Sequence, residues 1–159
     1  MKHIISLVVE NRPGVLARIV GLISGRGYNI HSLNVAPSQD ATVSHLTMVV
    51  PGDDRVLEQV VKQLNKVVDV IKVHDFTGEK CADRELLLVK VLTTAKNRAT
   101  VIELVALCRG EIICVQNNRL TIQVVGTTDA LDNFLELLKP HGIEEVSRTG
   151  VIAVGQSGE

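Results

Sequence analysis

The chain has 159 residues, with 17 Lys and Arg against 18 Asp and Glu, so its formal charge is −1. This balance excludes a strongly basic grip on nucleic acid and a polybasic membrane patch as its main function. Apolar residues make up 45% of the chain, enough for a core, which excludes a disordered protein. Aromatic residues make up only 2%, too few for the stacking platforms that hold single-stranded nucleic acid.

The cysteines and the apolar runs indicate the cellular compartment in which the protein is expected. Cys81, Cys108 and Cys114 include no CxxC pair, and an odd number makes a poor disulfide framework. The N-terminus lacks the long apolar core of a signal peptide. No apolar run approaches the roughly 20 residues that span a bilayer. We therefore expect a cytoplasmic protein with no membrane partner.

The first half of the chain alternates short apolar runs with turn residues. Runs rich in Val, Ile and Leu and bounded by Gly, Pro or Asn predict strands, whereas apolar residues spaced i, i+4, i+7 predict helices. Gly25 ends the first helix, and Asp53 or Asp54 caps the second. The predicted elements are a strand at 4–9, a helix at 15–23, strands at 29–37 and 43–50, a helix at 56–64 and a strand at 67–74.

The second half repeats this order. Asn97-Arg98 stands before its first helix, where Asn11-Arg12 stands in the first half. Asn117-Asn118 is typical of a hairpin turn, and Thr127 or Thr128 caps the second helix. The predicted elements are a strand at 86–92, a helix at 101–107, strands at 112–115 and 120–125, a helix at 131–138 and a last strand at 151–154.

Both halves therefore read β-α-β-β-α-β, which predicts an α+β protein made of two ferredoxin-like sandwiches. The expected domains are residues 1–77 and 84–159, joined by a polar linker at 78–83. Each sandwich has helices on one sheet face only. Because small domains bury a modest share of their surface and bare sheets attract partners, we expect oligomerisation.

The loop before the first helix is the best candidate for a ligand site. Unpaired N–H groups at a helix start point toward an incoming anion, and the helix dipole adds positive charge. Pro13 gives up a donor that the helix does not need, and Gly14 lets a ligand approach the backbone. A carboxylate fits this turn, although an ordinary loop-to-helix turn has the same sequence. Further along, the Asn29 amide suits a zwitterion, and the alternative is a turn residue bonded to its own backbone.

Other chemistry finds little support in the sequence. The five histidines are scattered, and no pair has the spacing of metal ligands on a helix, so we expect no metal site. No G-x-S-x-G motif occurs, and no cysteine lies beside a base, so we expect no catalytic residues. Arg148-Thr149-Gly150 is a basic turn that either docks a partner's carboxylate or caps the last strand.

Two segments carry a family resemblance. The segment at 8–16, VVENRPGVL, resembles the opening of an ACT domain, a small-molecule sensor built as β-α-β-β-α-β. With GYNIHSL at 27–33, it resembles the regulatory small subunit of acetohydroxyacid synthase, also called acetolactate synthase. The turn at 148–150 is similar to the second domain of that family. The resemblance covers nearly the whole chain.

The resemblance implies a non-catalytic subunit in branched-chain amino acid biosynthesis. Such a subunit binds and activates a large catalytic subunit that carries thiamine diphosphate, Mg and FAD, and it has no cofactor of its own. The resemblance also implies a homodimer through ACT domains and feedback inhibition by valine, leucine or isoleucine bound at that interface. The effector residues that it implies are Asn11, Pro13, Gly14, Val15 and Leu16, with Asn29 and Ile30 from a neighbouring ACT domain.

Two alternatives stay open at this point. An ACT-type amino-acid sensor can regulate a different enzyme or a transcription system, and the first half alone does not distinguish these targets. A ferredoxin-like acylphosphatase needs an Arg to cradle phosphate and an Asn to place water, and Arg12 and Asn11 can mimic that pair. The glycine-rich cradle of that enzyme is not laid out in this chain.

Overall fold

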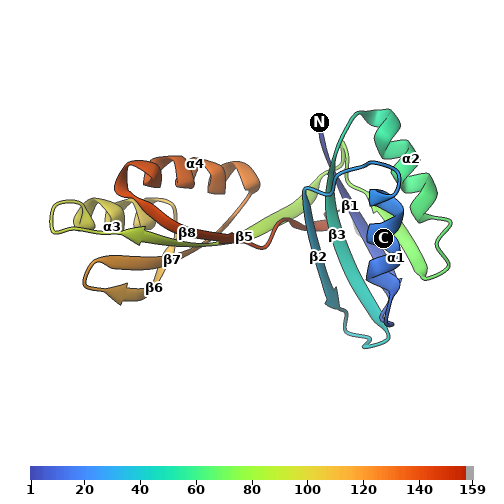
Figure 1. Cartoon of the computed structure of the whole chain (residues 1–159), viewed down its shortest axis with the longest axis horizontal. Coiled ribbons are helices and arrows are strands. Elements are labelled where there is room, and N and C mark those ends of the chain that lie inside the picture. The colour runs from blue at the N-terminus through green and yellow to red at the C-terminus, as the bar shows by residue number, and fades with distance from the viewer. Residues whose placement is uncertain (157–159) are drawn as a thin grey trace. The chain divides into compact units, whose positions relative to one another are not determined.

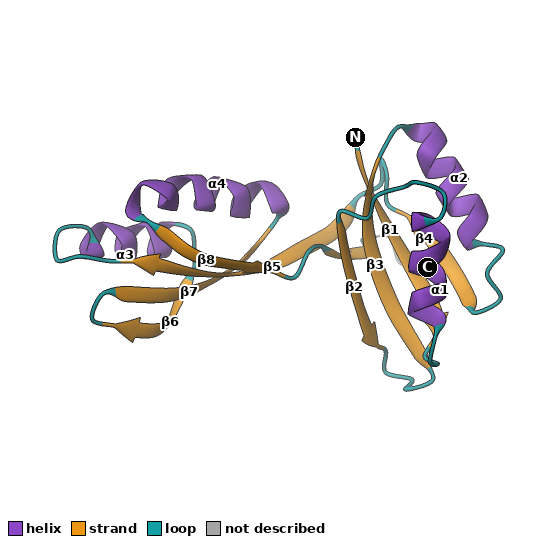
Figure 2. Cartoon of the chain, in the orientation of Figure 1, coloured by secondary structure: helices purple, strands orange, loops and turns teal. Residues whose placement is uncertain are grey.

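The computed structural model describes residues 1–156. Within them the chain forms two compact units. The first unit comprises Met1–Asp83 together with the C-terminal segment that begins at Val151, and the second comprises Arg84–Gly150. None of the helices in the described residues is long and apolar enough to cross a membrane. Figure 1 labels the elements, and Figure 2 separates helices from strands by colour.

The first unit is an antiparallel sheet with two helices on one face (Figure 1). Its strand order is β2-β3-β1-β4, with β2 at one edge. The residues of β1 alternate between buried and half-exposed, as expected of a strand with one covered face. Its elements are β1 (Lys2–Glu10), α1 (Val15–Ser24), β2 (Ser32–Pro37), β3 (Val43–Pro51), α2 (Asp54–Leu64) and β4 (Val70–Asp75).

Apolar residues from both helices and the two inner strands, β1 and β3, close the core of this unit. Its fully buried members include Leu7 of β1, Ile19 of α1, Met48 of β3 and Leu64 of α2. The start of α2 follows from its sequence, because the Asp53 side chain accepts a hydrogen bond from the Val56 amide at 2.9 Å. This is the capping bond that the sequence predicts for one of the two aspartates.

The second unit repeats the architecture, with the sheet order β6-β7-β5-β8. Its core is built around Phe134 of α4, which is fully buried among Val and Leu side chains of the strands and of α3. Thr127 caps α4 through a hydrogen bond from the Ala130 amide. The elements are β5 (Cys81–Leu92), α3 (Arg98–Leu107), β6 (Glu111–Gln116), β7 (Arg119–Gly126), α4 (Thr128–Leu138), a 3₁₀ turn (Lys139–His141) and β8 (Ile143–Arg148). The ferredoxin-like α+β fold is thus confirmed in both halves.

The end of the chain differs from the sequence prediction. The strand that completes the second sheet is β8, Ile143–Arg148, where no strand was predicted. The predicted strand at 151–154 forms as β9, Ile152–Gly155, but it pairs with β5 and groups with the first unit. The expected linker at 78–83 also differs, because β5 begins at Cys81. Within the expected second domain at 84–159, the chain returns to the first unit at Val151.

The returning segment lies against the sheet face that the helices leave open. The Asn34 side chain donates a hydrogen bond to the Val151 carbonyl at 3.3 Å, and β9 contacts β3. Val151 is 6% exposed, and Val49, which points away from the helical core, is only 3% exposed. The segment at 151–155 thus contributes to the packing of the first unit.

Val151→Ala is expected to destabilise the first unit by about 2 kcal/mol, because it removes buried apolar atoms and leaves a cavity. Val154→Ala is the matched control, since Val154 is 66% exposed and its truncation should cost under about 0.5 kcal/mol. Residue-resolved hydrogen exchange measures both. Protection should fall in β3 while β7 is unchanged; a loss confined to β7 would contradict this assignment of the C-terminal segment.

Candidate functional site

The loop between β1 and α1 is tied to the turn that joins β2 and β3. The backbone N–H of Asn11 donates to the Thr42 carbonyl at 2.7 Å, and its side-chain amide donates to the Ala41 carbonyl at 2.8 Å. Within the described residues, the Asn11 side-chain oxygen accepts no hydrogen bond. Asn11 therefore fixes the loop through its donors and keeps an acceptor for a ligand's ammonium group.

The β2–β3 turn is itself held by a carboxylate. Asp40 accepts hydrogen bonds from the Thr42 hydroxyl at 2.7 Å and from the Thr42 amide at 2.9 Å. These bonds lower the pKa of Asp40 below its ordinary value, and the bond from the Thr42 hydroxyl has the largest effect. The carboxylate thus stays ionised at neutral pH, and the turn presents fixed carbonyls to Asn11.

The start of α1 is open for an anion. Gly14 has a φ of 86° at the N-cap position, and no side chain caps the helix. In residues 1–156, the backbone N–H groups of Gly14, Leu16 and Ala17 have no acceptor from the chain itself. A Cβ atom built on Gly14 would meet nothing within 4 Å. Free donors at a positive helix end next to open space favour binding of a carboxylate.

The two apolar residues that follow Gly14 have different environments. Val15 is 4% exposed and packs in the core of the first unit, so its side chain anchors the helix start. Leu16 is 39% exposed, and its side chain is available to an apolar ligand group. Of this predicted pair, Leu16 alone is placed to contact a branched side chain without a movement of the core.

Ionic pairs lie beside the loop, and no sequence pattern had placed them in the site. Arg12 pairs with Glu10 and lies 3.9 Å from Asp69, whose side chain is 11% exposed. Arg18, one turn into α1, also pairs with Asp69. Since Asp69 is far from the loop in sequence, no local pattern indicates this contact. Because the Arg12 guanidinium already has carboxylate partners, the geometry does not support the phosphate cradle of an acylphosphatase.

Asn29 and Ile30 lie at the opposite end of α1 from Gly14. They follow the C-terminus of a ten-residue helix, which is about 15 Å long. Asn29 is exposed, and Ile30 is half-buried against the core. A strand was predicted from 29 onward, but β2 begins at Ser32. One copy therefore does not bring all seven predicted residues together, and a site that uses both groups requires two copies.

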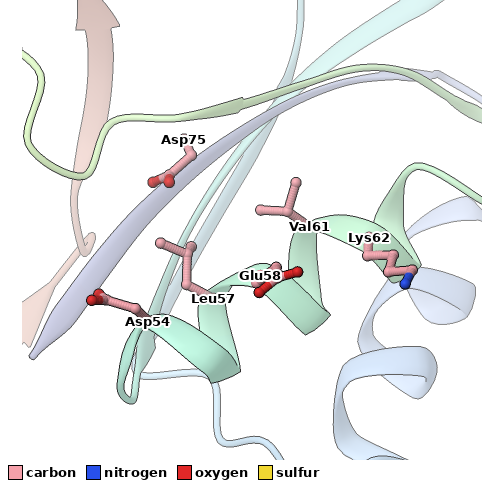
Figure 3. A pocket seen from close by; sticks show the side chains of 6 residues that line it. All are labelled: Asp54, Leu57, Glu58, Val61, Lys62 and Asp75. Carbon is pink, nitrogen blue, oxygen red and sulfur yellow. The ribbon is translucent and has the colours of Figure 1, made fainter.

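A separate depression of about 510 Å³ lies beside α2 (Figure 3). Leu57 and Val61 line it together with Lys62 and three carboxylates, those of Asp54, Glu58 and Asp75. It contains none of the predicted effector residues. Across the part of the chain that the structure describes, no three His, Cys, Asp or Glu side chains gather as metal ligands.

The basic turn of the second unit has its partners within the chain. Arg148 donates two hydrogen bonds of 2.8 Å to Glu85 and one of 2.5 Å to Asp132. Glu85 is 5% exposed and also accepts from the Thr128 hydroxyl at 3.3 Å. These contacts raise the pKa of Arg148, and the hydrogen bonding to Glu85 has the largest effect. The sequence left open a partner's carboxylate or a cap of the last strand. The structure instead shows Arg148 joining β8 to β5 and α4.

The β-α-β-β-α-β first unit, with its open helix start, defines an ACT-domain protein. A family model described as the AHAS small subunit-like ACT domain matches residues 5–72. A second, described as the small subunit of acetolactate synthase, matches residues 84–157. The chain therefore belongs to the acetolactate synthase small subunit family, as the sequence motifs indicate.

Relatives and a solved structure agree with this assignment. The chain is 44% identical to the probable acetolactate synthase small subunit of Archaeoglobus fulgidus, covering 97% of this chain and 96% of that protein. It is 43% identical to the acetolactate synthase isozyme 3 small subunit of Salmonella typhimurium, covering 98% of this chain and 96% of that protein. The crystal structure of the Thermotoga maritima small subunit superposes with a TM-score of 0.90 at 33% identity, covering 100% and 99%.

Proposed function

We propose that this chain is the regulatory subunit of an acetolactate synthase holoenzyme in branched-chain amino acid biosynthesis. It activates a large subunit that carries thiamine diphosphate, Mg and FAD, and it makes that subunit sensitive to valine or a related amino acid. The chain supplies no catalytic residue or cofactor. The holoenzyme acts in the cytoplasm, in keeping with three free cysteines.

The open helix start at Gly14 is the observation that carries the effector proposal. Backbone donors there bind the amino-acid carboxylate, and Asn11 holds the ammonium group through its free side-chain oxygen. Leu16 of the same copy and Ile30 of a second copy enclose the branched side chain. A pocket of this kind separates ligands that differ by one methylene by only about 1–3 kcal/mol, so leucine and isoleucine bind as competitors of valine.

Two copies of the first unit complete the site. Because Asn29 and Ile30 lie about one helix length from Gly14, a second ACT domain brings its own pair to the loop. The edge strand β2, which ends next to the β2–β3 turn and exposes Val35, leaves a sheet edge for that neighbour. A ligand bound between copies then shifts their arrangement by its differential affinity, with a coupling of about 1–3 kcal/mol.

Asn29→His is expected to raise the valine concentration for half inhibition about 10-fold, because one hydrogen bond to a charged group is lost. Activation of the large subunit should be unchanged, since Asn29 is exposed and belongs to the first unit. Asn11→Ala is a less selective test, because it also removes the bond to Ala41. The measurement is acetolactate formation by the reconstituted holoenzyme against valine concentration.

The matched control is Asn133→His, at an exposed asparagine of α4 in the second unit. It should leave half inhibition within about twofold of the unchanged protein. Full valine sensitivity in Asn29→His would remove Asn29 from the site. If the chain neither bound nor activated a large subunit, the regulatory role itself would be wrong.

A further inference from the structure

A groove of about 1010 Å³ lies on the face of the first unit's sheet opposite α1 and α2. Its floor comes from the residues of β1 that alternate with the buried Leu7 and Val9. One wall is the turn after β4, and the other is the C-terminal segment. The lining residues are Ser6, Val8, His45, Lys72, His74, Phe76, Glu79, Lys80 and residues 153–156.

The strand register places basic side chains side by side on this floor. Val8 of β1 pairs with His45 of β3 on one side and with Lys72 of β4 on the other. Ser6 pairs with His74 in the next row. Because directly opposite residues of an antiparallel pair share a face, these side chains all project into the groove.

Cationic groups outnumber anionic ones along the lining. Lys72 and Lys80 carry two positive charges, and Glu79 is the single carboxylate among the described lining residues. The Glu79 carboxylate lies 2.9 Å from the His74 ring, so it is already engaged. The groove thus has a net positive charge without counting the two imidazoles.

The spacing of these groups fixes the kind of anion that they can hold. Residues i and i+2 of one strand, such as Lys72 and His74, are about 7 Å apart at the backbone. Lys72 and His45 are separated by two strand spacings, or about 10 Å. A molecule with two separated anionic groups can engage two of these side chains at once.

We propose that this groove binds a small molecule that carries at least two anionic groups, such as a diphosphate or a dicarboxylate. Lys72 and Lys80 supply the charge, and Ser6 and His45 supply hydrogen bonds. The volume matches a small organic ligand rather than a lone ion. None of the predicted effector residues lines the groove, so this site is separate from the one at Gly14.

Calorimetric titration of the full chain with inorganic pyrophosphate, malonate and acetate tests this site. Pyrophosphate or malonate should bind at least tenfold more tightly than acetate, and the tighter of the two identifies the ligand class. The side-chain NMR signals of His45 and His74 should shift on binding, while His141 of the second unit should not.

The double variant Lys72→Gln/Lys80→Gln should weaken binding at least tenfold. The control is Lys62→Gln/Lys66→Gln, which removes the same charge outside the groove. Lys62 lies in α2 and Lys66 follows it, and this variant should change the binding affinity less than twofold. Unfolding curves of both variants show that the fold is kept. Equal weakening in the two variants, equal binding of acetate, or a matching shift of His141 would overturn the proposal, because each indicates attraction by overall charge alone.

Discussion

Gly14→Asp is expected to abolish feedback inhibition at valine concentrations that fully inhibit the unchanged holoenzyme. The added carboxylate occupies the open space before α1 and faces the free amides that bind the effector's own carboxylate. Two like charges about 4 Å apart repel by about 4 kcal/mol near a protein surface, before screening. We expect the concentration for half inhibition to rise at least about 100-fold, measured on reconstituted holoenzyme.

Gly14→Asn separates charge from backbone strain. Asn and Asp have the same shape and tolerate the left-handed φ of 86° at this position equally well, but Asn adds no charge. We therefore expect Gly14→Asn to raise the valine concentration for half inhibition by only about 10-fold. Activation should survive in both variants. Inhibition by valine that is unchanged in Gly14→Asp would remove the helix start from the site.

Arg148→Ala is expected to destabilise the second unit by about 3 kcal/mol, because it leaves the carboxylate of Glu85 buried with the Thr128 hydroxyl as its remaining partner. Arg148 itself is 27% exposed, so we place the effect at the lower end of what breaking a buried ion pair costs. Chemical denaturation followed by signals from β7 measures the loss. Activation of the large subunit should fall with it if the second unit makes that contact.

Arg119→Ala is the matched control for Arg148→Ala. Arg119 of β7 also pairs with a glutamate, Glu144 of β8, at 2.7 Å, but both side chains are about one-third exposed. An exposed pair of this kind contributes under about 1 kcal/mol. Adding Glu85→Gln to Arg148→Ala should recover part of the loss, because it removes the buried charge. An equal cost for Arg119→Ala and Arg148→Ala would contradict the role given to burial.

Local signals in the sequence account for most of the fold. Caps such as Asp53 and Thr127 and stops such as Gly25 are short-range, so the helix positions follow from the chain itself. The strand β8 was missed because IEEVSR has only two apolar residues in six and lies at a sheet edge, where polar side chains are tolerated. The segment at 151–154 has a clear strand pattern, but no local pattern reveals which sheet a strand joins.

The candidate site, like the fold, could be predicted from the sequence only in part. The opening at Gly14 follows from a Pro-Gly turn before a helix, and the structure places it as the pattern indicates. Two other features depend on contacts between residues that are distant in the sequence. One is the ion pair between Asp69 and Arg18, and the other is the hydrogen bonding of Asn11 to the β2–β3 turn. The separation of Asn29 from Gly14 follows from the length of α1, which is what leads to a site shared by two copies.

Mixed dimers test the shared site most directly. Two differently tagged copies, one carrying Gly14→Asp and the other Asn29→His, are co-expressed, and the dimer holding both tags is purified. If each site takes its loop from one copy and Asn29 from the other, the mixed dimer regains one intact site. Calorimetry should then find one valine of unchanged affinity per dimer, where each parent has none. A mixed dimer with no such site would mean that both groups act within one copy, which contradicts the account.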